Sequence, residues 1–121
     1  MNHLFPDNAG LSFEDFFKLY LKNLNESFNT LDIPKTISAI DRLIENIHSE
    51  GNIFTCGNGG SSSIADHFVC DLVKGASSDS KVQPKVISLL NTPLLTAIAN
   101  DMAYDDIFSF PLSKYAKKGD I

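Results

Sequence analysis

The sequence has no tryptophan, only two cysteines and no long uninterrupted apolar run. Two cysteines are too few for a disulfide framework or a cysteine metal knuckle, so Cys56 and Cys70 are expected to be small core residues. No stretch approaches the roughly 18 apolar residues of a membrane-spanning helix, and the N-terminus lacks the basic start and apolar core of a signal peptide. These absences predict a cytoplasmic protein with no membrane partner.

Positive charge is also scarce, since 10 Lys and Arg stand against 15 Asp and Glu and the formal net charge is −5. Domains that bind nucleic acid usually carry a basic patch, so no nucleic-acid partner is expected. The hydrophobic (43%) and charged (21%) fractions are ordinary, and 121 residues suffice for one domain with its own core. We therefore expect a single soluble domain, with helices over residues 11–50 and an α/β part over residues 52–121.

A glycine-rich turn, GNGG at positions 57–60, is the most informative feature. It lies between a short apolar run at 53–56 and a helical pattern that opens with three serines, an order typical of strand, tight loop and helix. One of these serines is expected to cap the helix. Glycines let a ligand approach the backbone beside the free N–H groups of the helix, although the turn matches neither GxGxxG nor GxxxxGK[ST]. Two interpretations stay open: a site for an anion or for sugar hydroxyls, or simply a sharp connection.

Two helices are predicted ahead of this turn. Ser12 and Asp15 stand at capping-box spacing, and apolar residues then recur every three or four positions as far as Leu31. Asp32 and Pro34 mark the start of a second helix, which is expected to end near Gly51. The pattern predicts a helical hairpin whose first helix buries its apolar stripe in the core or, alternatively, against another subunit.

The rest of the sequence predicts a parallel α/β unit. Residues 86–90 form a second apolar run, expected to be a buried strand parallel and adjacent to residues 53–56 because a helix separates them. Further helices are expected at 94–99 and at 107–118, the latter closed by Gly119, and residues 120–121 would begin a third strand. Parallel sheets normally have at least four or five strands, so we expect the sequence to be truncated after its second strand.

His67 and Asp71 are the residues best suited to chemistry, because a spacing of four places both side chains on one helix face. An imidazole beside a carboxylate can transfer protons or hold a metal ion such as zinc. The alternative is an ordinary surface pair of weak energy. The aspartates between positions 101 and 106 are expected to serve a solvated turn only.

The segments CGNGGSSSIADHFVCDLVKG (56–75) and LLTAIANDMAYDDIF (94–108), in this order, resemble the sugar isomerase (SIS) domain of the phosphoheptose isomerase type. The resemblance covers the chain from about Leu11 onward. It implies a flavodoxin-like three-layer fold in which helices flank a five-stranded parallel sheet. It also implies that the two N-terminal helices help to build a homotetramer and that active sites are shared between subunits.

The resemblance further implies a sugar-phosphate substrate. Members of the family convert sedoheptulose 7-phosphate to D-glycero-D-manno-heptose 7-phosphate for the heptose of lipopolysaccharide or other surface glycans. The residues implied to bind substrate are Asn58, Gly59, Gly60, Ser61 and Asn91. His67 and Asp71 are implied as catalytic residues, with Asp71 as the base, and as ligands of zinc, which several members hold.

The chain departs from the family pattern in three respects. Asp71 stands where typical members have Glu, and Asn91 stands where some have Asp. The Ser/Thr-rich phosphate loop and the late Gln and His of the family would lie beyond Ile121.

Two other functions remain as alternatives. The first is a non-catalytic SIS protein that binds sugar phosphates or associates with a replication initiator, although a carboxylate at position 71 favours the enzyme. The second, a sugar-phosphate-sensing regulator, would need a DNA-binding helix-turn-helix, which the acidic, aromatic N-terminal helices do not supply.

Overall fold

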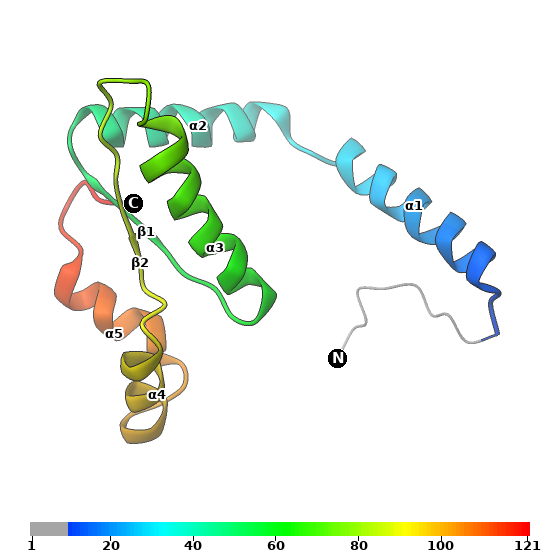
Figure 1. Ribbon diagram of the computed structural model, residues 1–121. Coiled ribbons are helices and arrows are strands. Elements are labelled where there is room, and N and C mark those ends of the chain that lie inside the picture. Colours follow the sequence, from blue (N-terminus) through cyan, green and yellow to red (C-terminus); the bar gives the residue numbers. More distant parts are fainter. Residues whose placement is uncertain (1–9) are drawn as a thin grey trace. The chain divides into compact units, whose positions relative to one another are not determined.

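A computed structural model of the chain describes residues 10–121, and the chain divides into two units, Met1–Ser38 and Ala39–Ile121. The first unit contains α1 (Phe13–Asn29) and the start of α2 (Ile33–His48), and the second begins within α2 (Figure 1). The following elements are β1 (Asn52–Thr55), α3 (Gly60–Cys70), the π-helical segment η1 (Asp71–Ala76), β2 (Lys85–Ser88), α4 (Thr92–Asp101) and α5 (Asp106–Tyr115). Among residues 10–121, no helix combines the length and apolar content needed to cross a membrane.

Helix α1 begins at the predicted capping box. The Asp15 N–H donates to Ser12 Oγ at 3.1 Å, and the Ser12 hydroxyl donates to Asp15 Oδ2 at 2.7 Å. No residue of α1 is buried, and its apolar stripe is exposed at Phe13, Phe17, Leu21, Leu24 and Phe28. Within the described residues this stripe does not enter a core, while the packing of α1 on α2 as a hairpin stays a prediction.

Helix α2 begins at its predicted cap and ends in a strained turn. The Lys35 N–H donates to Asp32 Oδ1 at 3.0 Å, and this bond lowers the pKa of the Asp32 carboxyl. At the other end, the N–H groups of Glu50 and Gly51 return to the carbonyls of Ile47 and Asn46. Glu50 takes φ +57°, a left-handed conformation that helix ends usually give to glycine.

The two strands pair in parallel as predicted, with Ile53 opposite Val86 and Phe54 opposite Ile87. Ile53 is buried, but β2 alternates between exposed and half-buried residues, and Ile87 is exposed. The prediction that both strands are buried is therefore wrong for β2, which among residues 10–121 pairs with β1 alone. Helix α3 packs on the sheet, and the buried apolar residues are Ile53, Ala65, Leu89, Ile98 and Ile107.

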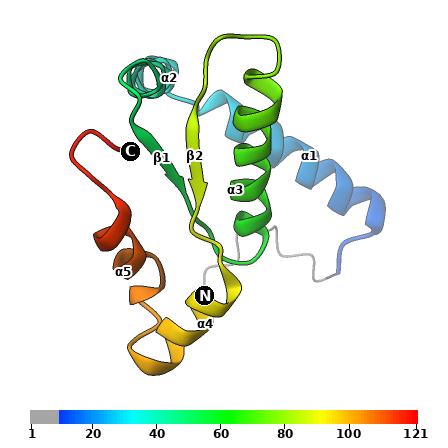
Figure 2. The same ribbon diagram turned by 60° about the vertical axis from the view of Figure 1, so that its left-hand side comes forward.

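Ile121, where the start of a third strand was predicted, makes two backbone hydrogen bonds to β1, although no third strand is assigned within residues 10–121. Its N–H donates to the Asn52 carbonyl at 3.0 Å, and its carbonyl accepts from the Phe54 N–H at 2.7 Å. Asn52 and Phe54 turn these groups to one edge of β1, whereas Thr55 accepts from Leu89 on the β2 side, so Ile121 and β2 flank β1 (Figure 2). Of the segments that follow β1 in the chain, β2 therefore lies on one side of it and Ile121 on the other. In open parallel sheets, ligands bind at the carboxyl ends of the strands, at the point where the strand order reverses in this way.

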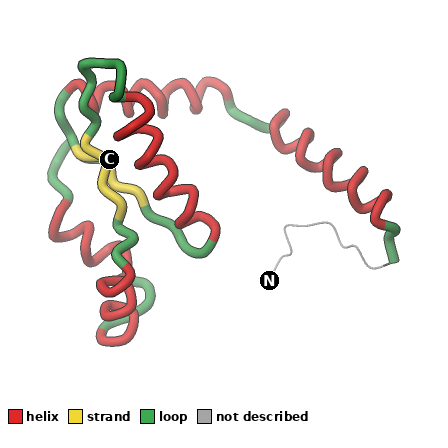
Figure 3. The backbone as a smooth tube through the Cα atoms, in the orientation of Figure 1, coloured by secondary structure: helices red, strands yellow, loops and turns green. Residues whose placement is uncertain are grey.

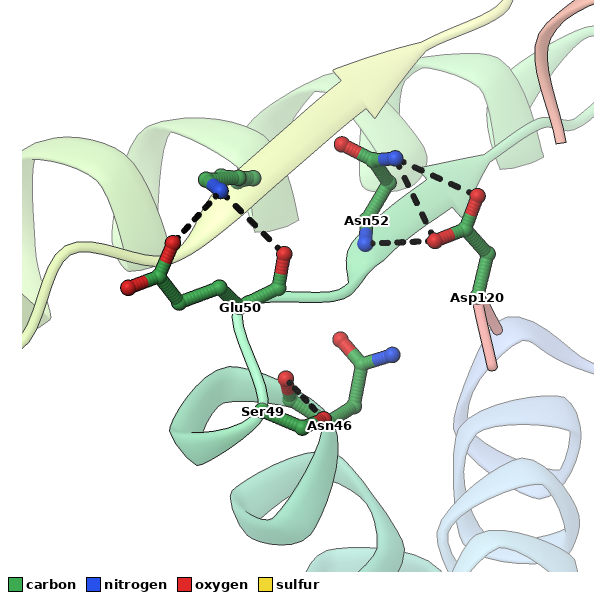
Figure 4. Close-up of polar contacts among 6 residues, drawn as sticks. Asn46, Ser49, Glu50, Asn52 and Asp120 are labelled. Carbon is green, nitrogen blue, oxygen red and sulfur yellow. Dashed lines mark hydrogen bonds and ion pairs between the residues drawn. The ribbon is translucent and has the colours of Figure 1, made fainter. Parts of the chain in front are cut away.

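Polar contacts hold the residues before Ile121 against the start of β1 (Figure 4). The Asp120 carboxylate accepts from the Asn52 N–H and from the Lys117 N–H, each at 2.8 Å. These bonds, led by that from Asn52, lower the pKa of Asp120. The Asn46 side-chain amide of α2 donates to the Gly119 carbonyl at 2.8 Å. The end of α2 and residues 117–121 are therefore both tied to β1.

Helices α4 and α5 confirm the two helices predicted after the second strand, and they pack on each other. Their ends differ from the predicted ones, because α4 runs over residues 92–101 and α5 over residues 106–115. Gly119 does not close α5 as predicted. The chain leaves the helix at Ala116, which has an extended ψ of 144°, and Gly119 instead takes φ +100° in the turn before Ile121.

Candidate functional site

The glycine-rich turn joins the carboxyl end of β1 to α3, as the loop between strand and helix in Figure 3 shows. At Gly57 an added Cβ would lie 2.6 Å from the backbone carbon and oxygen of Ser61, so the close approach of α3 requires glycine there. Gly59 takes φ +55° and also requires glycine. Gly60 has neither constraint, because its φ is not positive and a Cβ would meet nothing within 4 Å. The open space above Gly60 is room in which a ligand can approach the backbone.

The serines that follow do not cap α3, which corrects the sequence-based expectation. The N-cap is Gly59, and no side chain hydrogen-bonds there. The Ser62 hydroxyl donates to the Gly59 carbonyl at 2.6 Å. The Ser61 hydroxyl has no hydrogen-bond partner within the described residues, and its side chain is exposed. Ser61 is thus a free hydroxyl beside the open space at Gly60.

His67 and Asp71 lie on one face of the helix as predicted. His67 Nε2 is 3.6 Å from Asp71 Oδ1, and the two side chains are 76% and 64% exposed. At Asp71 the helix changes from α to π geometry and continues as η1, a change that no feature of the sequence predicted. Single π-helical turns inside helices occur frequently at functional sites. The pair is open to solvent and accessible to a substrate or to another copy of the chain.

The glycine-rich turn and the His67–Asp71 pair do not meet within one chain. At 1.5 Å per residue, His67 lies roughly 10 Å and Asp71 roughly 16 Å beyond Gly60 along the helix axis. A general base must lie within about 3 Å of the proton it takes, or act through one water. A reacting carbon held directly over Gly60 is therefore beyond the reach of Asp71 of the same chain.

Asn91 has a structural role that the sequence analysis did not give it. Its side-chain oxygen accepts from the Leu94 N–H at 3.0 Å and caps α4. Thr55 and Ser88 are paired at the carboxyl ends of the two strands. Asn58 and Asn91 each follow three residues later, so both lie beyond the same end of the sheet. The contact between Asn91 and a substrate stays a prediction.

Asp66 and Ser88 form a contact that sequence reasoning missed. The Ser88 hydroxyl donates to Asp66 Oδ1 at 2.6 Å and accepts from the Leu90 N–H at 3.2 Å. This bond ties α3 to the end of β2. The helix that carries His67 is thereby linked to the segment that leads to Asn91. The partners are 22 residues apart, so no local pattern signals the pair.

Metal binding finds partial support in the side chains present. Within residues 10–121, no group of three or more His, Cys, Asp or Glu residues is arranged to hold a metal ion. His67 and Asp71 offer two donors of the type that zinc accepts, whereas a zinc site in a protein usually has three or four protein ligands. Cys56 and Cys70 are both exposed, so the expectation that they are core residues is wrong.

Comparison with known proteins establishes the family. Residues 16–121 match the family described as the SIS domain. The chain belongs to the SIS domain family. It is 38% identical over 102 residues to a probable phosphoheptose isomerase of Thermoplasma volcanium, a match that covers 84% of this chain and 52% of the relative. The phosphoheptose isomerase of Helicobacter hepaticus is 32% identical over 108 residues, or 89% of this chain and 54% of the relative.

The SIS fold is also found in a solved structure. Phosphoheptose isomerase GmhA from Neisseria gonorrhoeae superposes with a TM-score of 0.72 and 29% identity, covering 88% of this chain and 54% of that protein. The chain therefore spans about half the length of the relatives that it matches. The α/β fold with a parallel sheet, inferred from the motifs, is confirmed.

Proposed function

We propose that this SIS-domain chain acts in an aldose–ketose isomerase that converts sedoheptulose 7-phosphate to D-glycero-D-manno-heptose 7-phosphate in the cytoplasm, for lipopolysaccharide or other surface glycans. The observation that carries the proposal is the exposed imidazole–carboxylate pair of His67 and Asp71, on the helix that begins at the open glycine-rich turn. The names of the matched relatives support the same reaction class.

The reaction moves a proton between adjacent carbons and another between their oxygens. In the proposed mechanism, the Asp71 carboxylate takes the proton from the carbon beside the carbonyl and returns it to the former carbonyl carbon. His67 Nε2 takes the proton from the hydroxyl oxygen and passes it to the former carbonyl oxygen. Zinc, if His67 and Asp71 served as its ligands in place of these proton-transfer roles, would polarise the carbonyl oxygen.

The glycine-rich turn is proposed to bind the sugar. The open space at Gly60 admits sugar hydroxyls to the backbone, and the unpaired Ser61 hydroxyl can donate to or accept from them. Asn58 and Gly59 belong to the same turn, and Asn91 follows β2 at the same end of the sheet. These contacts orient the reacting carbons for the proton transfer.

The proposed active site is shared between subunits of a homotetramer. The roughly 16 Å between Gly60 and Asp71 along the helix supports this arrangement, because a reacting carbon held directly over Gly60 lies beyond the reach of Asp71 in the same chain. The exposed apolar stripe of α1 offers a surface for subunit association.

Asp71→Asn tests the proposed base. The change is nearly isosteric and the position is exposed, so the fold should persist while turnover of sedoheptulose 7-phosphate falls by about 10²-fold to 10⁴-fold, the usual contribution of a general base. Asp71→Glu should retain activity or raise it, and His67→Ala should lower activity and weaken zinc binding. Asp79→Asn, an exposed loop carboxylate, is the matched control and should leave turnover unchanged.

The same assay tests the shared site when two inactive variants are mixed. Gly60→Asp blocks the turn and Asp71→Asn removes the base, so mixed oligomers should regain activity if the two groups come from different subunits. If Asp71→Asn turned over substrate as fast as the wild type, the assignment of Asp71 as the base would be refuted. Absence of turnover in every form of the full-length protein, with sedoheptulose 7-phosphate or a replication initiator still bound, would favour the non-catalytic SIS protein.

A further inference from the structure

A pocket lies at the amino ends of the two strands, opposite the end from which the glycine-rich turn leaves β1. It has a volume of about 410 Å³ and lies where the amino ends of β1 and β2 meet the end of α2. Its charged and titratable lining residues are His48, Glu50, Lys81 and Lys85, and Ile47 and Val82 add apolar wall. The turn at Gly57–Gly60 follows the carboxyl end of β1, so the two places share no residue.

The charges in this pocket favour an anion. Lys85 Nζ lies 3.2 Å from the Glu50 carboxylate and 3.2 Å from the Glu50 carbonyl oxygen. Lys81 is exposed and has no ion-pair partner within the described part of the chain. Two lysines against one glutamate leave an excess of positive charge in a protein whose net charge is −5. The Lys81 ammonium is therefore available to pair with a small anion in this pocket.

Glu50 already places a carboxylate on Lys85, at a conformational cost. Its φ of +57° belongs to the left-handed region, which is strained for a non-glycine residue. Figure 4 shows the Glu50 side chain turned back toward the start of β2. The carboxylate that this turn holds on Lys85 marks a position that a carboxylate or phosphate oxygen can occupy.

We propose that this pocket binds a small doubly charged anion, a phosphate or a dicarboxylate, between Lys81 and Lys85. The incoming anion displaces the Glu50 carboxylate from Lys85 and recruits Lys81, while any carbon skeleton it carries packs against Ile47 and Val82. The binding is independent of isomerase activity, because it uses none of the residues of the proposed sugar site.

Titration with inorganic phosphate, followed by the amide NMR signals of the protein, tests this site. Saturable shifts should occur at residues 47–51 and 81–85, and a parallel titration with malonate shows whether a dicarboxylate is preferred. Lys85→Met should raise the Kd about tenfold, the effect of one lost charge-assisted hydrogen bond. Should Lys85→Met fail to fold, Lys81→Met tests the same point. Lys118→Met, an exposed lysine outside the pocket, should leave the Kd unchanged.

Glu50→Gln distinguishes a binding site from a merely structural ion pair. Because the carboxylate competes with the anion for Lys85, its removal should tighten phosphate binding by about twofold to fivefold, the range of an exposed ion pair. Weaker binding in Glu50→Gln would overturn the proposal. So would shifts confined to residues 57–62, which would place the anion at the sugar site, or the absence of saturable shifts at residues 47–51 and 81–85.

Discussion

Two residues separate Gly57 from Gly60 in the sequence, yet the surroundings of the two glycines differ. The backbone of Ser61 occupies the space beside Gly57, whereas the space beside Gly60 is empty. Gly57→Ala should therefore destabilise the protein by about 1–3 kcal/mol, the usual effect of overpacking. Gly60→Ala should leave stability unchanged or raise it by up to about 1 kcal/mol, because alanine favours the helix. Urea denaturation of both variants measures the difference.

In sugar-phosphate binding, Gly60→Ala is expected to be the impaired variant, although its stability is not reduced. Gly60→Ala places a methyl group where the ligand is proposed to approach, so its affinity for sedoheptulose 7-phosphate should fall although the fold is intact. Calorimetry measures this affinity directly. If Gly60→Ala bound the sugar as well as the wild type, the glycine-rich turn would be no more than a connection between strand and helix.

At the scale of elements, Asp120 holds the segment before Ile121 against β1. Its pKa is lowered chiefly by the Asn52 N–H, so the ionised carboxylate stabilises the fold above about pH 4, the usual pKa of aspartate. This contribution is lost as the pH falls through the lower pKa of the folded state. Asp120→Asn should lower the Tm near neutral pH, because the amide nitrogen cannot accept the second N–H bond, and the difference from the wild type should shrink in acid.

The Asp79→Asn variant provides the comparison for this pH series. Asp79 is exposed in the loop before β2 and accepts no hydrogen bond within the described residues, so its Tm should follow that of the wild type at every pH. A Tm difference for Asp120→Asn that persisted unchanged well below about pH 3 would show that the charge of Asp120 is not what holds the segment.

At the scale of the whole molecule, the apolar stripe of α1 is the feature that calls for a partner surface. Phe17 and Leu21 are 61% and 58% exposed, and one helix with such a stripe is costly to leave in water. Phe17→Glu should shift the proposed homotetramer toward smaller species, as measured by light scattering on a sizing column. Lys22→Glu, on the polar face of the same helix, should leave the mass unchanged. A monomeric wild type would contradict the proposed assembly.

Features whose cause is local could be predicted from the sequence. The capping box at Ser12 and Asp15 and the cap at Asp32 depend on residues three apart, and the structure confirms both. The spacing of His67 and Asp71 likewise fixes their shared helix face. The serine cap on α3 was wrong because Gly59, with its positive φ, lets the helix begin earlier than any serine.

Features that depend on neighbours distant in the chain could not be predicted. Cys56 and Cys70 match the composition of core residues, yet both are exposed, because burial depends on which element covers a position. The burial of β2 was overestimated for the same reason, since Ile87 points to a face of the sheet that leaves it exposed. The Asp66–Ser88 contact and the Glu50–Lys85 pair join residues 22 and 35 positions apart, separations at which no periodic pattern operates.

The sequence by itself determined the helices, the two parallel strands, the glycine-rich turn and the SIS family, because caps, periodicity and motif order act over a few residues at a time. Only the tertiary structure decided that Ile121 pairs with β1 on the edge away from β2, which puts the turn at the point where the chain reverses direction. It also decided that Asp66 of α3 meets Ser88 at the end of β2. Such contacts follow from how a rigid helix is set against a sheet, and that placement depends on contacts summed over the whole fold.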